Sequence, residues 1–311
     1  MPVRARELSF VLHPVAPFRL DLTAWTLRRR AINELDRWDG HTYARTIAVA
    51  DRAVDVEVTQ SGSASRPALN VIVRGAAGRG VRTTATAALS RALGLDLDLA
   101  DFYRMARADA RLASLVDQFR GVKPPRFPTV FEAVVNGIAC QQLSLTVGII
   151  LLGRLCKLCG LRSPRGRYAF PRPKDVAALT PAQLRALGFN RNKVRALLEL
   201  ARAVEAGFDL EALADLDDGA VVERLVALRG IGRWTAEYVL LRGLGRLSTF
   251  PGDDVGARTN LARWMHLRTP LDYDRVRQLA RRWEPYPGFL YFHLLLRSLD
   301  EAGVLGIEHA A

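Results

Sequence analysis

A short turn between two apolar segments constrains the second half of this chain more than any other feature. The segment runs Leu228-Arg-Gly-Ile-Gly-Arg-Trp-Thr-Ala-Glu-Tyr238. Because Gly230 and Gly232 lack a Cβ atom, the backbone can adopt positive φ there and can approach another backbone closely. We therefore expect two helices joined by a tight hairpin. A glycine cap between two antiparallel helices would explain the same pattern without any ligand.

The beginning of the second helix has the properties of an anion site. The turn leaves the main-chain amides of Gly232, Arg233 and Trp234 without helical partners, and a helix N-terminus carries partial positive charge. Such amides bind phosphate oxygens. A second segment, Phe250-Pro-Gly-Asp-Asp254, places two carboxylates 20 residues after Trp234, where another helix is expected to begin. Together the two segments indicate chemistry on DNA.

These segments resemble the helix-hairpin-helix DNA glycosylase superfamily, and within it the bacterial 3-methyladenine DNA glycosylase II type. Further similar segments follow in the family's order: Tyr43–Val49, Ile138–Ser144, Phe170–Pro173, Ala186–Gly188 and Arg282–Pro285. Because the matches span most of the chain in the right order, they argue against a chance similarity.

The resemblance implies a mainly α-helical fold, in which a two-lobed helix-hairpin-helix glycosylase core follows an N-terminal α+β domain that contains an antiparallel sheet. The N-terminal domain is expected at residues 1–100 and the core at residues 101–311. One lobe is expected at about 127–247, and the other at about 101–126 plus 248–311.

Local patterns in the residues predict the individual elements. Alternating apolar and polar residues predict strands at Val54–Val58 and Leu69–Val73, and Thr84–Leu93 is expected to form a helix. In the rest of the chain the periodicity is helical, and Thr180 and Asp272 are expected to cap helices.

The resemblance assigns the catalytic carboxylate to Asp254, the second acid of the pair. Cleaving a base from deoxyribose builds positive charge on the sugar, and a fixed carboxylate stabilises that charge. The same carboxylate can orient or deprotonate the attacking water. Asp253 is then the expected N-cap of the following helix. Taken alone, such a pair of acids would be explained by helix capping.

Trp234 and Tyr238 are four residues apart, so they lie on one face of a helix. There they can stack on an extruded base, and an electron-deficient alkylated purine suits such rings, by analogy with cation–π attraction. A buried aromatic pair is the structural alternative. Bifunctional relatives have a lysine at the position of Trp234, whereas Lys193 is expected in a different helix pair. We therefore expect water to be the nucleophile.

One position departs from the pattern of the 3-methyladenine type, which has a second pocket tryptophan on its last long helix. In the segment Phe289–Leu295 that position is Leu295. The pocket then lacks one aromatic wall unless Tyr291 or Phe292 compensates, which implies an altered range of alkylated bases. His293 is expected either in the core or directly behind the pocket residues, rather than as a general acid.

Base flipping also needs a side chain that fills the gap in the stack. Gln142 occupies the family's intercalating position, and Leu143 beside it is the alternative wedge. The structural alternative is that Gln141 and Gln142 only bond to local backbone. The residues expected to bind the DNA phosphate through the hairpin are Gly230, Ile231, Gly232, Arg233 and Thr235.

No soluble cofactor and no metal held by side chains is implied. Family hairpins often bind a monovalent cation through main-chain carbonyls, and here those of Arg229 and Ile231 could do so. Some relatives carry a four-cysteine iron–sulfur cluster near the C-terminus. This chain has no cysteine after Cys159, which excludes that cluster. Cys156 and Cys159 are expected to be small buried hydrophobes.

The composition agrees with a DNA partner. The chain has 311 residues and a formal net charge of +13, which attracts polyphosphate in a salt-dependent way. Three cysteines are too few for a disulfide framework and favour a reducing compartment. Met1 leads into charged residues, and no apolar run reaches membrane-spanning length. We expect a cytoplasmic, nucleoid-associated monomer that binds double-stranded DNA containing damaged bases and does not contact a membrane.

The resulting prediction is a monofunctional glycosylase that hydrolyses the N-glycosidic bond of alkylated purines in base excision repair. It flips the base and uses Asp254 to assist attack by water. Two alternatives remain open: a glycosylase for another purine lesion, such as a deaminated or oxidised one, and a non-catalytic helix-hairpin-helix DNA-binding protein. The presence of Asp254 favours an enzyme, because non-specific DNA binding gains nothing from an acid that faces phosphates.

Overall fold

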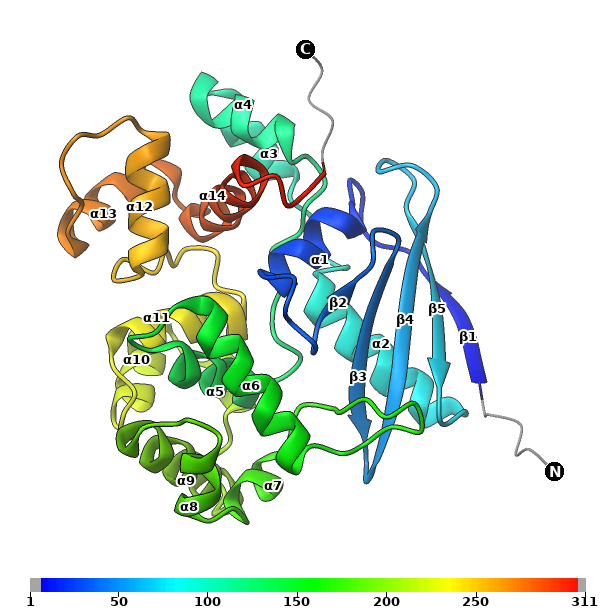
Figure 1. Ribbon diagram of the computed structural model, residues 1–311. Helices are drawn as coiled ribbons and strands as arrows, with labels where there is room; N and C mark the ends of the chain where they lie inside the picture. Colours follow the sequence, from blue (N-terminus) through cyan, green and yellow to red (C-terminus); the bar gives the residue numbers. More distant parts are fainter. Residues whose placement is uncertain (1–6, 307–311) are drawn as a thin grey trace.

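The computed structural model describes residues 7–306, in which an antiparallel sheet is followed by a long helical part (Figure 1). The expectation about the first residues after Met1 lies outside this range. Within it, no helix is both long and apolar enough to cross a membrane. The mainly α-helical fold with an N-terminal antiparallel sheet is confirmed.

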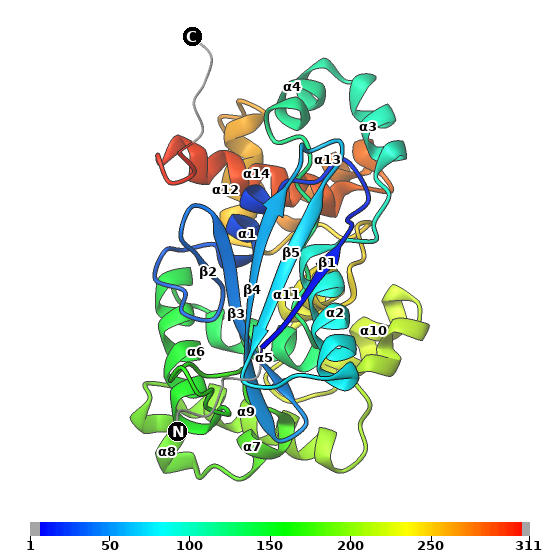
Figure 2. The same cartoon turned by 90° about the vertical axis from the view of Figure 1, so that its right-hand side faces the viewer.

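The sheet has five strands in the order β1-β5-β4-β3-β2, and every neighbouring pair is antiparallel. The strands are β1 (Glu7–Leu12), β2 (Arg37–Trp38), β3 (Thr42–Val49), β4 (Arg52–Ser61) and β5 (Ala68–Arg74). Both predicted strands are confirmed, as parts of β4 and β5. In Figure 2 the sheet faces the viewer and covers one side of the helical part.

Two helices accompany the sheet: α1 (Leu20–Arg28) and α2 (Arg79–Leu93). Their buried residues, among them Leu27 and Leu89, share one hydrophobic core with Val56 and Val71 of the sheet. The helix expected at Thr84–Leu93 is therefore confirmed as the last two thirds of α2.

The helical part has two further hydrophobic cores. One is formed by α5 (Val130–Cys140), α6 (Leu145–Cys159), α7 (Pro173–Ala177), α8 (Pro181–Ala186), α9 (Arg191–Glu205), the 3₁₀ turn Glu211–Asp215, α10 (Asp218–Val226), α11 (Arg233–Val239) and the start of the π-helical turn Leu240–Leu244. The other is formed by α3 (Ala100–Arg107), α4 (Ala110–Gln118), α12 (Val255–Trp264), α13 (Tyr273–Ala280), the 3₁₀ turn Arg281–Trp283 and α14 (Pro287–Glu301). We propose that the three cores mark an N-terminal domain and two helical lobes.

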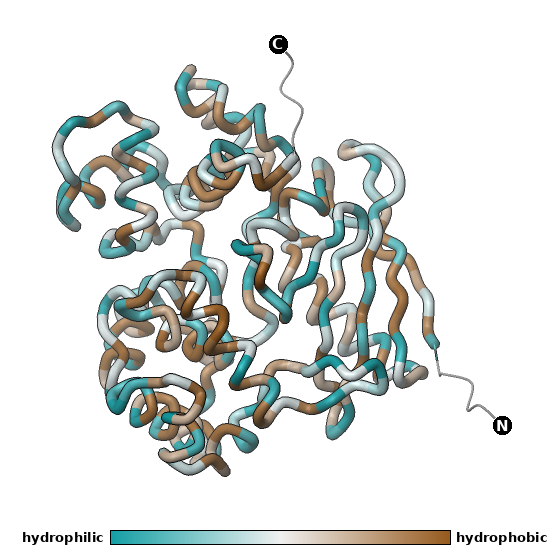
Figure 3. The backbone as a smooth tube through the Cα atoms, viewed as in Figure 1, coloured by the Kyte–Doolittle hydropathy of each residue, from teal (hydrophilic) through white to brown (hydrophobic). Residues whose placement is uncertain are grey.

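The predicted helix caps have clear physical causes. Thr180 and Gln183 form a capping box, in which each side chain bonds to the other residue's main-chain amide. The carboxylate of Asp272 accepts the amide of Arg275 at the start of α13. Both N-caps are therefore confirmed. Figure 3 shows the hydrophobic stretches that recur along the strands and helices, with hydrophilic stretches in the outer loops.

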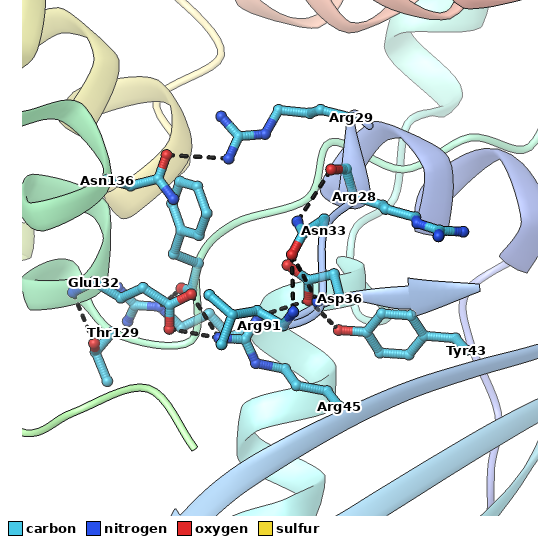
Figure 4. Close-up of polar contacts among 12 residues, drawn as sticks. Arg28, Arg29, Asn33, Asp36, Tyr43, Arg45, Arg91, Thr129, Glu132 and Asn136 are labelled. Carbon is cyan, nitrogen blue, oxygen red and sulfur yellow. Dashed lines mark hydrogen bonds and ion pairs between the residues drawn. The ribbon is translucent and has the colours of Figure 1, made fainter. Parts of the chain in front are cut away.

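A buried ionic cluster joins the sheet to the helical part (Figure 4). Arg45 of β3 pairs with Asp36 at 2.6 Å and with Glu132 of α5 at 2.5 Å, and each of the three side chains is only 3% exposed. The hydroxyl of Tyr43 donates to Asp36 over 2.8 Å. Because removing one partner would leave a charge buried and unpaired, this cluster fixes the position of the sheet against α5.

Candidate active site

The predicted hairpin is present between α10 and α11. Gly230 has φ 81°, and a Cβ atom there would lie 2.6 Å from the Cβ of Ala196 in α9. Glycine is therefore required both by the backbone and by the neighbouring helix. The amide of Ile231 donates to the carbonyl of Leu228 over 3.2 Å, which closes the turn, and α11 begins at Arg233.

A cleft of about 1210 Å³ lies beside the hairpin and extends to α12 and α14. It gathers residues from distant parts of the sequence: Arg29, Cys140, Gln142, Leu143, Lys193, Gly230, Gly232, Trp234, Tyr238, Asp254, Tyr291 and Leu295 are among those that line it. The predicted acid, base-pocket residues and wedge residues thus surround one space.

Asp254 lies at the start of α12 and is half-buried. Its Oδ1 accepts the amide of Ala257 over 2.8 Å, so Asp254 itself is the N-cap. The expectation that Asp253 caps this helix is wrong. Since the turn from Pro251 ends with Asp254 in an extended conformation, the helix begins one residue later than expected. Asp253 instead accepts two hydrogen bonds from the guanidinium of Arg233, at 2.9 and 2.7 Å.

A second network holds the loop that carries these acids. Glu237 of α11 accepts the amide of Gly252 over 3.1 Å and the hydroxyl of Tyr273 over 2.6 Å. Burial raises the pKa of the Glu237 carboxyl above its ordinary value. Arg233 lies 3.7 Å above the ring of Tyr273, which links the two networks. Glu237 and Tyr273 are functional-site residues that the sequence does not single out, although an acid inside an apolar helix is a signal that points to Glu237.

Trp234 and Tyr238 stack on each other, with ring centroids 5.5 Å apart and an interplanar angle of 24°. The indole Nε1 of Trp234 donates to Asp254 Oδ2 over 3.3 Å. The hydroxyl of Tyr238 lies 2.8 Å from a guanidinium nitrogen of Arg29 and donates to Asn136 Oδ1 over 3.1 Å. The two rings therefore have a carboxylate on the Trp234 side and a guanidinium on the Tyr238 side.

Leu295 and Tyr291, both on α14, also line this cleft. The hydroxyl of Tyr291 is buried, which raises its pKa, and the nearby Asp254 acts in the same direction. Phe292 is fully buried in the core of its lobe, so Tyr291 is the aromatic residue that accompanies Leu295 at the cleft. His293 is fully buried, its Nδ1 lies 3.0 Å from the carbonyl of Phe289, and burial lowers its pKa to about 4. Its expected place in the core is confirmed.

The turn between α5 and α6 carries the two wedge candidates. Gln142 is exposed with φ 52°, and Leu143 is 44% exposed. The side-chain amide of the preceding Gln141 donates to the carbonyl of Gly230 and to Thr235 Oγ1, both over 2.9 Å. The alternative in which Gln141 bonds only to local backbone is therefore wrong, because the Gln141 side chain connects this turn to the hairpin.

The hairpin residues expected at a phosphate differ in exposure. Gly230, Gly232 and Arg233 are exposed, whereas Ile231 and Thr235 are buried. The hydroxyl of Thr235 accepts from Gln141, and the guanidinium of Arg233 is bound to Asp253. Among these five residues, main-chain amides are thus the main donors available to an anion. The cation site at main-chain carbonyls stays a prediction.

Lys193 lies on α9, in a different helix pair from Trp234 as expected, yet it lines the same cleft. It is 4% exposed, its ammonium donates to the carbonyl of Ala139 over 2.8 Å, and burial lowers its pKa. The place of Lys193 at the cleft is not predictable from the sequence, because it depends on how α9 packs against α5.

Comparisons with known proteins agree with this geometry. Residues 135–285 match the HhH-GPD superfamily of base excision DNA repair proteins, and residues 9–128 match the AlkA N-terminal domain. The chain is 29% identical over 204 residues to a DNA-3-methyladenine glycosylase of Bacillus subtilis (strain 168). The aligned region covers 64% of this chain and 67% of that protein. It is 30% identical over 177 residues to DNA-3-methyladenine glycosylase 2 of Escherichia coli (strain K12), which covers 56% of this chain and 60% of that protein.

A solved structure gives a more complete match. The 3-methyladenine DNA-glycosylase from Archaeoglobus fulgidus aligns with a TM-score of 0.80 at 26% identity, over 94% of this chain and 98% of that one. The AlkA N-terminal match includes most of the sheet, and the HhH-GPD match runs from α5 to the residues that precede α14. The chain therefore carries an AlkA N-terminal domain followed by an HhH-GPD domain of base excision DNA repair proteins, and its homologues include DNA-3-methyladenine glycosylases.

Proposed function

We propose that this protein is a monofunctional DNA glycosylase that hydrolyses the N-glycosidic bond of alkylated purines in double-stranded DNA. One observation carries the proposal: Asp254 faces a cleft at the edge of the Trp234–Tyr238 stack, beside a helix-hairpin-helix turn. The cleft is large enough for a purine, and its aromatic wall suits an extruded base.

The chemistry follows from the charges in the reaction. In a purine alkylated at N3 or N7 the ring carries positive charge, so the base leaves neutral when the C1′–N9 bond breaks and its electron pair moves to the ring. The sugar becomes oxocarbenium-like, and the Asp254 carboxylate stabilises it. Water then attacks C1′ and gives its proton to that carboxylate. A cationic base needs no general acid, which agrees with the burial of His293.

Water is proposed as the nucleophile because no amine stands next to the acid in the described residues. Trp234 occupies the position beside Asp254, and an indole cannot attack the sugar. The ammonium of Lys193 is bound to the carbonyl of Ala139, at the C-terminal end of α5. A Schiff-base lyase step is therefore not part of this proposal.

DNA binding is assigned to the exposed hairpin and to the wedge turn. The amides around Gly232 would hold a phosphate, while Gln142 or Leu143 would enter the stack that the flipped base leaves. The net charge of +13 supports binding to the phosphate backbone. We further propose that the enzyme works as a monomer on nucleoid DNA in the cytoplasm.

The test is release of free base from methylated duplex DNA by the wild type and by Asp254→Asn. Asparagine is also a good N-cap, so the variant keeps the start of α12 and loses only the charge. We expect 3-methyladenine and 7-methylguanine from the wild type, a loss of about 10²-fold or more in the variant, and unchanged DNA affinity.

Asp253→Asn is the matched control, since Asp253 is paired with Arg233 and is expected to keep most of the excision. Equal release by wild type and Asp254→Asn would refute the assigned acid. No release by the wild type, with intact salt-dependent DNA binding, would instead support a glycosylase for another purine lesion or a non-catalytic DNA-binding protein.

A further inference from the structure

Arg29 reaches the cleft from the N-terminal domain. It directly follows α1 and has φ 62°, and its amide caps the helix by donating to the carbonyl of Trp25. This turn directs the side chain away from the sheet and towards α5 and α11. Figure 4 shows its guanidinium pointing at Asn136. The residue is 4% exposed and lines the cleft, so it lies at the inner end of the space.

The guanidinium of Arg29 is not fully satisfied. One terminal nitrogen donates to the hydroxyl of Tyr238 over 2.8 Å and the other to Asn136 Oδ1 over 3.1 Å. Its Nε is buried without a hydrogen-bond partner, and within residues 7–306 no carboxylate forms an ion pair with it. A buried cation with neutral partners and a spare donor is costly for folding alone, which points to a ligand that accepts hydrogen bonds.

A second buried guanidinium adds to the positive charge. Arg242 is fully buried, and its terminal nitrogen donates to the carbonyl of Thr26 over 3.2 Å. Its Nε and other terminal nitrogen have no partner, and it lies 5.9 Å from the centroid of the Tyr238 ring. The end of the cleft near Tyr238 is therefore electropositive, whereas the end near Trp234 carries Asp254.

This polarity orients a base in the cleft. A purine that lies along the Trp234–Tyr238 wall with its sugar at Asp254 presents its far edge, which carries the substituent at C6, to Arg29. A guanidinium can only donate hydrogen bonds. A 6-oxopurine offers a carbonyl oxygen there, whereas a 6-aminopurine offers an amino group that also donates.

We infer that Arg29 is a specificity-determining residue that favours 6-oxopurine lesions, such as 7-methylguanine and hypoxanthine, over 6-aminopurine lesions such as 3-methyladenine. The inference rests on the proposed function and names the substrate class of the same site. With an uncharged 6-oxopurine, the electron pair of the breaking C1′–N9 bond stays on the departing base. The base is then an anion, and O6 shares its negative charge. Arg29 bonds that oxygen. The departed base then takes a proton from solvent, while Asp254 takes the proton of the attacking water.

The experiment uses Arg29→Gln on methylated duplex DNA, which contains 3-methyladenine and 7-methylguanine together. Both bases are cationic, and the same enzyme sample releases both from the same DNA. Their release ratio therefore depends neither on the net charge of the base nor on the fraction of the variant that is folded. We expect the ratio of 7-methylguanine to 3-methyladenine to fall about 10-fold or more in the variant, as for loss of a charged hydrogen bond. Release of hypoxanthine from an inosine-containing duplex should fall by at least as much.

Arg28→Gln is the control, because Arg28 is adjacent in sequence but its guanidinium binds the carbonyls of Trp38 and Ala31 outside the cleft. It should leave the ratio unchanged. If Arg29→Gln does not fold, the wild type still tests the inference: free hypoxanthine should inhibit base release at lower concentration than free adenine.

The outcomes distinguish failure of the role of Arg29 from failure of the proposed glycosylase function. Release of both methylated bases with an unchanged ratio in Arg29→Gln, or equal inhibition by hypoxanthine and adenine, would overturn the role of Arg29 and leave the proposed function standing. Absence of any base release by the wild type would overturn the proposed function, and this inference with it.

Discussion

The indole Nε1 of Trp234 lies 3.3 Å from Oδ2 of Asp254, and this contact joins the hairpin helix α11 to the helix that follows the paired acids. The other carboxylate oxygen of Asp254 accepts the amide of Ala257. Both oxygens of the proposed catalytic acid are therefore oriented by donors. A carboxylate held in this way can stabilise charge on a sugar without first having to reorganise.

Removing the indole N–H while keeping an aromatic ring tests this orientation. In Trp234→Phe the stack with Tyr238 can persist, but one donor to Asp254 is lost. We expect single-turnover base excision to slow about 10-fold, the effect of one hydrogen bond to a charged group, with little change in DNA affinity. Trp25→Phe, in α1, is the control and should excise normally. Equal rates for Trp234→Phe and wild type would show that the contact does not contribute.

The two hairpin glycines should differ in their tolerance of a methyl group. Gly230 has φ 81°, and a Cβ there would meet Ala196 at 2.6 Å. No atom lies within 4 Å of a Cβ placed on Gly232, whose φ is −99°. Gly230→Ala is therefore expected to lower the free energy of unfolding by about 1–3 kcal/mol, and Gly232→Ala by less than about 1 kcal/mol. Urea denaturation of both variants measures this, and similar losses would contradict the backbone argument.

Buried His293 makes the fold sensitive to acid. Burial lowers its pKa from 6.5 to about 4. A histidine whose pKa is depressed in the folded state binds its proton more weakly there, so its stabilising contribution is complete above pH 6.5 and is lost progressively as the pH falls towards 4. The contribution amounts to about 3 kcal/mol. In His293→Phe this part of the pH dependence should disappear.

The readout is the free energy of unfolding between pH 7 and pH 4.5, compared for wild type and His293→Phe. Base excision near pH 7 should be retained by the variant, since the imidazole is buried against Phe102 and Phe289 and is absent from the cleft lining. A parallel loss of stability in both proteins would refute the titration, and a selective loss of excision would indicate a catalytic role instead.

Most of the candidate site that could be predicted from the sequence lies in short contiguous segments of the chain. The acid, the aromatic pair and the hairpin lie in two short segments, so the sequence alone is enough to predict that Trp234, Tyr238 and Asp254 lie together at one cleft. The sequence predicts Asp253 as the N-cap of α12, whereas Asp254 caps it. A shift of one residue in the start of a helix is enough to exchange the roles of two adjacent acids.

The residues that the sequence did not reveal reach the site through tertiary packing. Arg29 belongs to the end of α1, about 200 positions before Tyr238, and no local periodicity connects them. Tyr273 meets Glu237 only because α13 packs beside the loop of the acids. Which residue enters the DNA stack also stays a prediction, because Gln142 and Leu143 are both exposed on the same turn.

Gln141 and Gln142 are adjacent, but replacing each by alanine is expected to affect a different property of the protein. Gln141 donates to the hairpin through Gly230 and Thr235, whereas Gln142 is exposed at φ 52°. Gln142→Ala should keep stability and reduce flipping of the target base, while Gln141→Ala should lower the free energy of unfolding by about 1–2 kcal/mol, because two hydrogen bonds are lost. Fluorescence of 2-aminopurine placed beside the target base reports flipping, and urea denaturation reports stability.

Leu143→Ala completes this comparison, because it removes the other wedge candidate from the same turn. If Gln142 fills the gap, fluorescence should fall in Gln142→Ala and stay near the wild-type value in Leu143→Ala. The reverse pattern would assign the wedge to Leu143, whose side chain is 44% exposed. Normal flipping in both variants would remove the wedge role from this turn, even though Gln141 ties it to the hairpin.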